Sequence, residues 1–522
     1  MKDFFAWWKE EKRYMRLIKA GVAALLPILC CLVYCAVQGR GIMQVYLPAS
    51  PWNDELFYFK QVEAIVDHGY PLGYYGFNES HALKLSFAAW SPVLVFPWII
   101  WGKLFGWGLL SPVICNILLL TLACFLFVWL TEADWKQIGV LALLFALFPL
   151  FVRYMLSGMP EIICMSMLII FYGLSVNYLR RDKGYKLAIL LLMASLMVLM
   201  RPYMLLFLLL PMVLWIKRSG KKGVAGSVIL MAVVLGAYAA IKHYLSAEYF
   251  APLFFTDWIT TFFTEGLAAG IKNFFGTLYY MGRNFCAYTL EGFKTGWTAG
   301  AFFGGYLLIL AVLLVHSVRN YRKKEYKQLV INGHLAFSFV GMFFALLLMY
   351  KLIEGSKHLL TFMAAGIFVI SLMETKFYKK AVLLGAVFAY LYTYQANDPY
   401  DYQVPFAQEE QVAQVNYWEE VFAEQLVPDK EARPDFRNSV IWDFQAKCEG
   451  EAYTNLKWQL LYALPSGMGI SCCRPDYVET HLEEMNCRYI ATVSGGTTDI
   501  RCRELGYAEL GRDADMVVYR RY

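Results

Sequence analysis

Apolar residues fill long, nearly unbroken stretches of this chain, and short polar segments separate them. A helix of about 18 or more apolar residues is long enough to cross a bilayer, so the pattern predicts a mainly α-helical polytopic bundle of about eleven spans. The expected spans are 17–38, 110–130, 136–153, 159–179, 185–200, 202–217, 223–243, 299–318, 333–352, 358–374 and 379–395.

One further apolar stretch, 90–107, is not expected to cross. Pro92, Pro97 and Lys103 interrupt it, and an apolar core of about 10–14 residues is typical of a re-entrant or interfacial segment. The first apolar run shows no small-residue cleavage site after it, so we interpret it as a retained anchor.

Basic residues cluster between the spans and predict the orientation. About 22 Lys and Arg lie in five clusters, which the positive-inside rule places in the cytoplasm if the N-terminus is cytoplasmic. These clusters are 2–19, 180–186, 217–222, 319–327 and 376–380. The loop 39–89, the turns 157–161 and 351–358, the segment 245–299 and the tail then face the outside.

The tail after Gln395 changes character. Alternating patterns predict strands at 439–444, 488–493 and 515–520, and a helix at 477–485 with Asp476 as its N-cap. The chain is therefore expected to divide into a transmembrane domain, 1–395, and a small extracytoplasmic α/β domain, 396–522. The tail sequence carries no nucleophile elbow, phosphate-binding loop or zinc motif, which favours a lid or docking module.

Composition agrees with an integral membrane protein. The chain is 59% hydrophobic and 17% charged, whereas soluble proteins are nearer half apolar and a quarter charged. The net charge of +6 arises from the clusters between spans, so it indicates orientation and not a nucleic-acid partner. The cysteines form no metal motif; free thiols and one or two disulfides remain alternatives for Cys448, Cys472, Cys473, Cys487 and Cys502.

Two adjacent acids, Asp54 and Glu55, follow the first span by about a dozen residues and lie among aromatics. A partly desolvated carboxylate there could act as a general base or bind a divalent cation. The alternative is a solvated acidic pair in the first turn of an interfacial helix, where the helix dipole favours negative charge.

A glycine- and tyrosine-rich stretch at 69–81 follows the acids. Tyr74 and Tyr75 offer flat faces and hydroxyls that suit a sugar ring, and glycine lets the backbone approach a ligand. Glu79 and His81 end the stretch; His81 is either a ligand or acid–base group or a hydrogen-bonded structural residue. The aromatic segment 245–299 either guides a lipid tail along the outer leaflet or forms a helical pair that covers the bundle.

Together these features resemble the GT-C superfamily of membrane glycosyltransferases, whose first external loop begins with an acidic motif. Asp54 and Glu55 stand at that place, and Glu161 matches a second acid on a later external turn. Lys357 and His358 stand on a late turn where the family more often has an Arg–Tyr pair. The ordered set of motifs and the external tail carry the resemblance.

The resemblance implies an inverting transferase that moves a sugar from a polyprenyl-phosphate or polyprenyl-diphosphate donor to a cell-surface glycan, lipid or protein. Asp54 would be the base, with Glu55 orienting it or binding metal, or the reverse. The donor-binding residues would be Arg201, Lys357, His358, Tyr74, Tyr75, Glu79 and His81, with Arg283 as a further cation.

The sequence leaves several alternatives open. A divalent metal, if one is used, would bind Asp54, Glu55 or His81. Arg201 could instead be an anchor that snorkels to the interface, and Arg283 could be a surface residue. A transporter or lipid flippase would show half-repeats and mid-membrane charges, which the sequence does not; a catalytically inactive scaffold is the third candidate.

Overall fold

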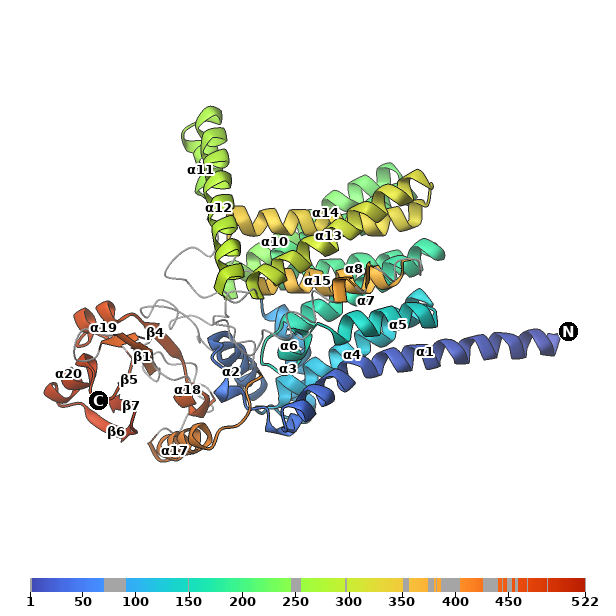
Figure 1. Cartoon of the computed structure of the whole chain (residues 1–522). Coiled ribbons are helices and arrows are strands. Elements are labelled where there is room, and N and C mark those ends of the chain that lie inside the picture. The colour runs from blue at the N-terminus through green and yellow to red at the C-terminus, as the bar shows by residue number, and fades with distance from the viewer. Residues whose placement is uncertain are drawn as a thin grey trace.

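A computed structural model describes residues 2–69, 91–148, 150–245, 255–295, 298–350, 356–373, 380–381, 383–385, 404–425, 440–443, 445–447, 453–455, 459–466, 468–485 and 487–521. Most of these residues form helices that run side by side in a bundle, and a smaller domain containing a sheet lies beyond one end of it (Figure 1). The chain is therefore mainly α-helical with a small C-terminal α/β domain, as predicted.

Within the described residues, seven helices are long and apolar enough to cross a membrane. Six of these candidate spans lie in α1 (Lys2–Val37), α4 (Ser111–Thr131), α7 (Glu161–Arg180), α10 (Lys221–Leu245), α13 (Thr298–Arg322) and α14 (Tyr326–Met349). The seventh is η4 (Pro202–Met204) continued by α9 (Leu205–Ser219). In the most apolar stretch of α7, 72% of the residues are buried inside the protein, whereas in that of α10 only 11% are buried. The helix α7 is therefore central, and α10 is peripheral.

Four shorter apolar segments also occur in the part of the chain that the structure describes: η3 (Pro92–Val95) with α3 (Phe96–Phe105), α5 (Trp135–Ala146), α8 (Gly184–Met200) and α15 (Ser356–Ser371). The segment η3–α3 matches the short apolar helix predicted there. The expected single span at 136–153 was wrong, because α5 ends at Ala146 and a separate helix, α6 (Leu150–Met155), follows. The sequence has a proline at position 149, and proline cannot continue a helix from the preceding turn. Most of the span expected at 379–395 lies outside the described residues.

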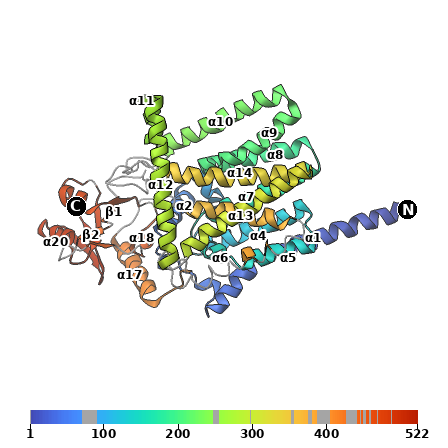
Figure 2. The ribbon, with the colours of Figure 1, turned by 45° about the horizontal axis from the view of Figure 1, so that its top comes forward.

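The segment expected to lie outside the membrane contains α11 (Asp257–Thr264) and α12 (Leu267–Thr295). The two helices lie against each other, and α12 runs steeply across the direction of the bundle helices (Figures 1 and 2). Trp258 stacks edge-on against Phe274, and Phe285 contacts Phe303 and Phe343. Of the two alternatives that the sequence offers for segment 245–299, this arrangement is the aromatic helical pair.

The C-terminal domain contains a five-stranded sheet of order β4-β1-β5-β7-β6. Its strands are β1 (Val440–Asp443), β4 (Ile470–Cys473), β5 (Tyr489–Val493), β6 (Ala508–Arg512) and β7 (Met516–Arg520). The first three pair in parallel and β7 pairs antiparallel with both β5 and β6. A separate antiparallel pair comprises β2 (Gln445–Lys447) and β3 (Tyr453–Asn455). The helices of the domain are α17 (Glu409–Gln425), α18 (Gln459–Ala463), α19 (Pro475–His481) and α20 (Thr497–Glu504).

The three predicted strands correspond to β1, β5 and β7, and the predicted helix corresponds to α19. The expected N-cap was wrong: Arg474 occupies that position without a side-chain cap, and Asp476 lies in the first turn. The described cysteines of the domain, Cys472, Cys473, Cys487 and Cys502, are all buried. Cys448 lies outside the described residues.

The tail packs against the start of the transmembrane domain through backbone contacts. Tyr46 N–H donates to the carbonyl of Pro405 at 2.8 Å, and Ala407 N–H donates to that of Gln44 at 2.9 Å. From α18, the Gln459 side chain donates to the carbonyl of Pro48 at 2.8 Å. The tail thereby covers the segment that leads into α2 (Asn53–His68), the helix that carries the acidic pair.

Candidate functional site

The acidic pair occupies the first turn of α2. Neighbouring residues of a helix point about 100° apart, so adjacent carboxylates meet different partners. Asp54 forms an ion pair with Lys357, the second residue of α15, and 36% and 21% of the two side chains remain exposed. Glu55 is fully buried on another face of α2. The structure therefore separates the two acids into different environments.

Glu55 forms a buried ion pair with Arg153 of α6, at 3.2 Å, and neither side chain is exposed. Arg153 also donates to the Ser50 hydroxyl at 3.1 Å and lies 3.6 Å from the centre of the Trp52 ring. Burial raises the pKa of Glu55, while the charge of Arg153 and the backbone N–H of Gly158 oppose that rise. These contacts close Glu55 off from solvent and join α2 to α6.

Gly158 lets the turn before α7 approach α2. A Cβ atom at this position would lie 3.2 Å from the Glu55 Cβ and 3.3 Å from the Leu47 Cδ1. Asn116 of α4 holds the same turn from the other side, since its amide donates to the carbonyls of Ser157 at 3.0 Å and Met159 at 3.2 Å. The turn thus places Glu161 at the first position of α7.

Glu161 forms the second buried ion pair. Its Oε1 accepts from Arg201 Nη2 at 2.6 Å, and both side chains are fully buried. Arg201 Nη1 also lies 2.9 Å from the Tyr203 hydroxyl and 2.8 Å from His358 Nδ1. A guanidinium only donates, so Nδ1 accepts in this contact and His358 is neutral, with its proton on Nε2. Arg201 is therefore a buried residue that contacts three polar side chains, and it is not a snorkelling anchor.

Tyr58 connects the two groups of charges. It lies one turn after Asp54 on α2 and is buried. Burial raises its pKa, and the charges of Arg201, Asp54 and Glu161 all act on its hydroxyl. Asp54, Lys357, Glu161 and Arg201 thus converge on one end of the bundle, from four separate segments of the chain.

Other predicted site residues lie apart from this cluster. Tyr74, Tyr75, Glu79 and His81 lie outside the described residues, so their predicted roles remain predictions. Arg283 is exposed on α12. Within the part of the chain that the structure describes, no three potential metal ligands gather, and Asp54 and Glu55 have different partners.

Four residues of the site were missed at the level of sequence. Tyr58 follows Asp54 by four positions, which is the helical spacing for a shared face. Arg153 and Asn116 are isolated polar residues within apolar runs, a pattern that marks functional or packed polar groups in membrane helices. No sequence pattern indicated a role for Tyr203 except its position two residues after Arg201.

These features define a multi-pass membrane protein with a charged, partly buried site at one end of its bundle. No protein-family model and no curated protein matches the chain. Among solved structures, it is similar to ArnT from Cupriavidus metallidurans in the apo state, with 11% identity and a TM-score of 0.44, over 99% of this chain and 98% of that one. A likeness at this level assigns neither a family nor an activity, so the function has to be argued from the site residues.

Proposed function

We propose that this protein is a membrane glycosyltransferase that moves a sugar from a polyprenyl-phosphate or polyprenyl-diphosphate donor to a glycan, lipid or protein of the cell surface. The observation that carries the proposal is the pairing of each acid in the cluster with a cation, at one end of the bundle. Glycosyl transfer from a lipid phosphate needs these two elements, a base for the acceptor and positive charge at the departing phosphate.

Among the described residues of the cluster, the charges of Asp54 and Glu161 balance those of Lys357 and Arg201. The pair Asp54–Lys357 is partly exposed, whereas Glu161–Arg201 is sealed. The donor phosphate therefore binds first to Lys357 and displaces Asp54 from it. This exchange releases the carboxylate at the moment when a phosphate occupies the site.

The reaction is a single displacement at the anomeric carbon. The acceptor hydroxyl or amine attacks that carbon, and its proton passes to the freed Asp54 carboxylate. The bond from carbon to the phosphate oxygen breaks, and its electron pair leaves with the phosphate, whose charge Lys357 stabilises. Arg201 and Glu161 position His358 and Tyr203 beside Lys357, and Glu55 positions α2 through Arg153.

The bundle end that carries the cluster faces the outside in this proposal. The last turns of α7, α9 and α13 carry basic residues. In α7 this turn is at the opposite end from Glu161, and the positive-inside rule places such residues on the cytoplasmic side. The C-terminal domain is on the side of the cluster (Figure 1), so it is extracytoplasmic. Both described acid–cation pairs of the cluster lie at helix ends, which disfavours the transporter alternative, because a transporter holds its charges near mid-membrane.

The test is turnover of polyprenyl-phosphate sugars by the purified protein. We expect Asp54→Asn to lower turnover by about 10²–10⁴-fold, the usual contribution of a general base. Asp67→Asn is the matched control, since it makes the same change at an exposed position in the last turn of α2. Full turnover by Asp54→Asn would exclude Asp54 as the base, and no sugar release by the wild-type protein from any such donor would contradict the proposed function.

A further inference from the structure

A cavity of about 220 Å³ opens at the end of the bundle remote from Asp54. The C-terminal ends of α7, α13 and α15 and the N-terminal end of α14 enclose it. The helix α7 begins at the acidic cluster and ends at this cavity, and its 20 residues span about 30 Å, the thickness of the hydrocarbon core. The cavity is therefore separate from the site described above.

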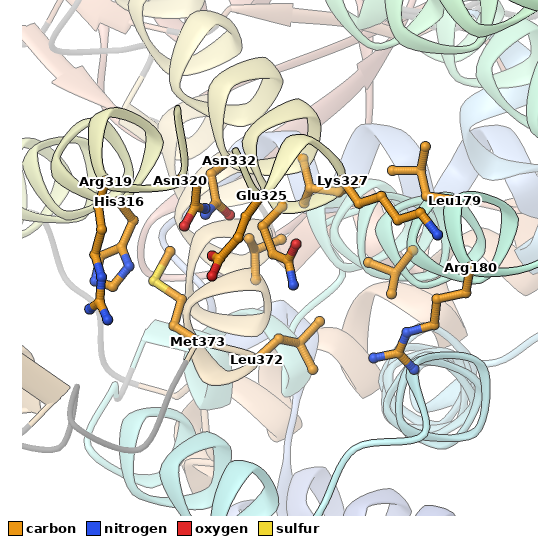
Figure 3. Close-up of a pocket in the computed structure, with 14 residues that line it drawn as sticks. Leu179, Arg180, His316, Arg319, Asn320, Glu325, Lys327, Asn332, Leu372 and Met373 are labelled. Atoms are coloured by element: carbon orange, nitrogen blue, oxygen red, sulfur yellow. The ribbon is translucent and has the colours of Figure 1, made fainter. Parts of the chain in front are cut away.

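The lining combines positive charge with an apolar surface. Arg319 lies on one side in Figure 3 and Arg180 and Lys327 on the other, with Asn320, Asn332 and Glu325 between them. The three cations and one carboxylate leave a net charge of +2 in the described lining. The apolar part of the wall consists of Val176, Leu179, Ile331, Val369, Leu372 and Met373.

We propose that this cavity binds the headgroup of an anionic phospholipid of the adjacent leaflet. Basic pockets between membrane helices on the cytoplasmic side are suited to such headgroups. Arginine and lysine bind the phosphate oxygens, and arginine does so with parallel hydrogen bonds. The carboxylate of Glu325 and the amides of Asn320 and Asn332 accept from headgroup hydroxyls, while the apolar wall receives the first carbons of the acyl chains.

Two asparagines make the cavity more selective than a basic surface. Asn320 and Asn332 are each 5% exposed, and they belong to adjacent helices, α13 and α14, that meet at the cavity. Both amides line the cavity, where they can hydrogen-bond to the hydroxyls and phosphate oxygens of a bound headgroup. A freely solvated phosphate compound would gain nothing from the apolar wall, so the mixed lining favours a lipid.

The experiment measures lipid retained by the purified wild-type protein in detergent, by native mass spectrometry after addition of phosphatidylglycerol or phosphatidylcholine. We expect preferential retention of phosphatidylglycerol. The double variant Arg319→Gln/Lys327→Gln should lower that retention about tenfold or more, because each cation contributes to the attraction. The double variant Arg322→Gln/Lys323→Gln, which removes two exposed charges of the same loop that do not line the cavity, should retain lipid as the wild type does.

Competition on the wild-type protein needs no variant and separates the two sources of a phosphate group. Soluble glycerol phosphate in excess should displace little phosphatidylglycerol; equal displacement would overturn the lipid assignment in favour of a soluble ligand. Equal retention of both lipids, or an equal loss in the two double variants, would overturn the site itself. Lipid retention is measured without sugar transfer, so its outcome is independent of the proposed enzymatic function.

Discussion

The buried pair Glu55–Arg153 predicts a specific pattern of stability and activity. Neither side chain is exposed, and removal of one partner from a buried ion pair costs about 3–5 kcal/mol, because an uncompensated charge stays buried. We therefore expect Arg153→Met to destabilise the protein by about this amount at neutral pH, because it leaves the Glu55 carboxylate buried without its cation. In Arg153→Met the side chain still covers the Trp52 ring, so the loss comes mainly from the charge.

The two single variants should differ in their dependence on pH. Burial already raises the pKa of Glu55, and the loss of Arg153 removes the charge that opposes this rise. An acid with a raised folded pKa contributes stability below its unfolded pKa and loses it as pH rises through the folded value. The stability of Arg153→Met should therefore rise as pH falls, whereas Glu55→Gln, which has no carboxyl at this position, should lack that rise.

The double variant Glu55→Gln/Arg153→Met leaves no charge to bury, so it should recover most of the lost stability. The assay is unfolding in mixed detergent micelles, followed by tryptophan fluorescence, together with sugar turnover. A positioning role for Glu55 predicts that activity returns with stability. Recovered stability without turnover would show that Glu55 takes part in the chemistry, and wild-type stability of Arg153→Met at neutral pH would refute the buried pair.

Two further predictions concern other parts of the chain. Gly158→Ala should destabilise the protein by about 1–3 kcal/mol, because the new methyl group would press on Glu55 and Leu47 at 3.2 and 3.3 Å. Gly139 is an exposed helical position where a Cβ atom meets nothing within 4 Å, so Gly139→Ala should cause no such loss. Unfolding in micelles measures both variants, and an equal loss of stability in the two would contradict the close approach. Burial raises the pKa of Asp443 in the C-terminal domain to about 6, so the stability of the protein should fall by about 3 kcal/mol as pH rises from about 4 through about 6. Unfolding measurements over this pH range should show that Asp443→Asn abolishes the fall. An unchanged dependence of stability on pH in this variant would contradict the raised pKa of Asp443.

Much of the bundle could be predicted because hydropathy is a local property of the sequence. The helices α4, α7, α8 and α10 lie close to their predicted bounds, and the same holds for strands β1, β5 and β7. The interruption between α5 and α6 was missed because the apolar run continues across it. Strand β4 was also missed, since it pairs with β1, a strand distant in the sequence. Strand β6 was missed as well, although it pairs with β7, the next strand in the sequence, through a register that shifts between Glu509 and Gly511.

The candidate site also combines features that the sequence predicts with features that only the fold determines. The acids and cations could be found as polar groups next to apolar runs, but their pairing could not. Arg153 lies 98 positions from Glu55, and Lys357 lies 303 positions from Asp54, so only the fold selects the partners. The sequence presents the adjacent acids as one motif, whereas in the structure their side chains leave α2 in different directions and meet different partners.

The central claim is that the donor phosphate displaces Asp54 from Lys357, and donor binding in the absence of acceptor tests it most directly. The measurement compares the affinity of the wild-type protein, Asp54→Asn and Lys357→Gln for a polyprenyl-phosphate sugar. Asp54→Asn removes the competitor for Lys357, so it should bind the donor at least as tightly as the wild type. Lys357→Gln should bind about tenfold or more weakly, because a hydrogen bond to a charged group is lost. Weakened binding by Asp54→Asn, or unchanged binding by Lys357→Gln, would contradict this claim.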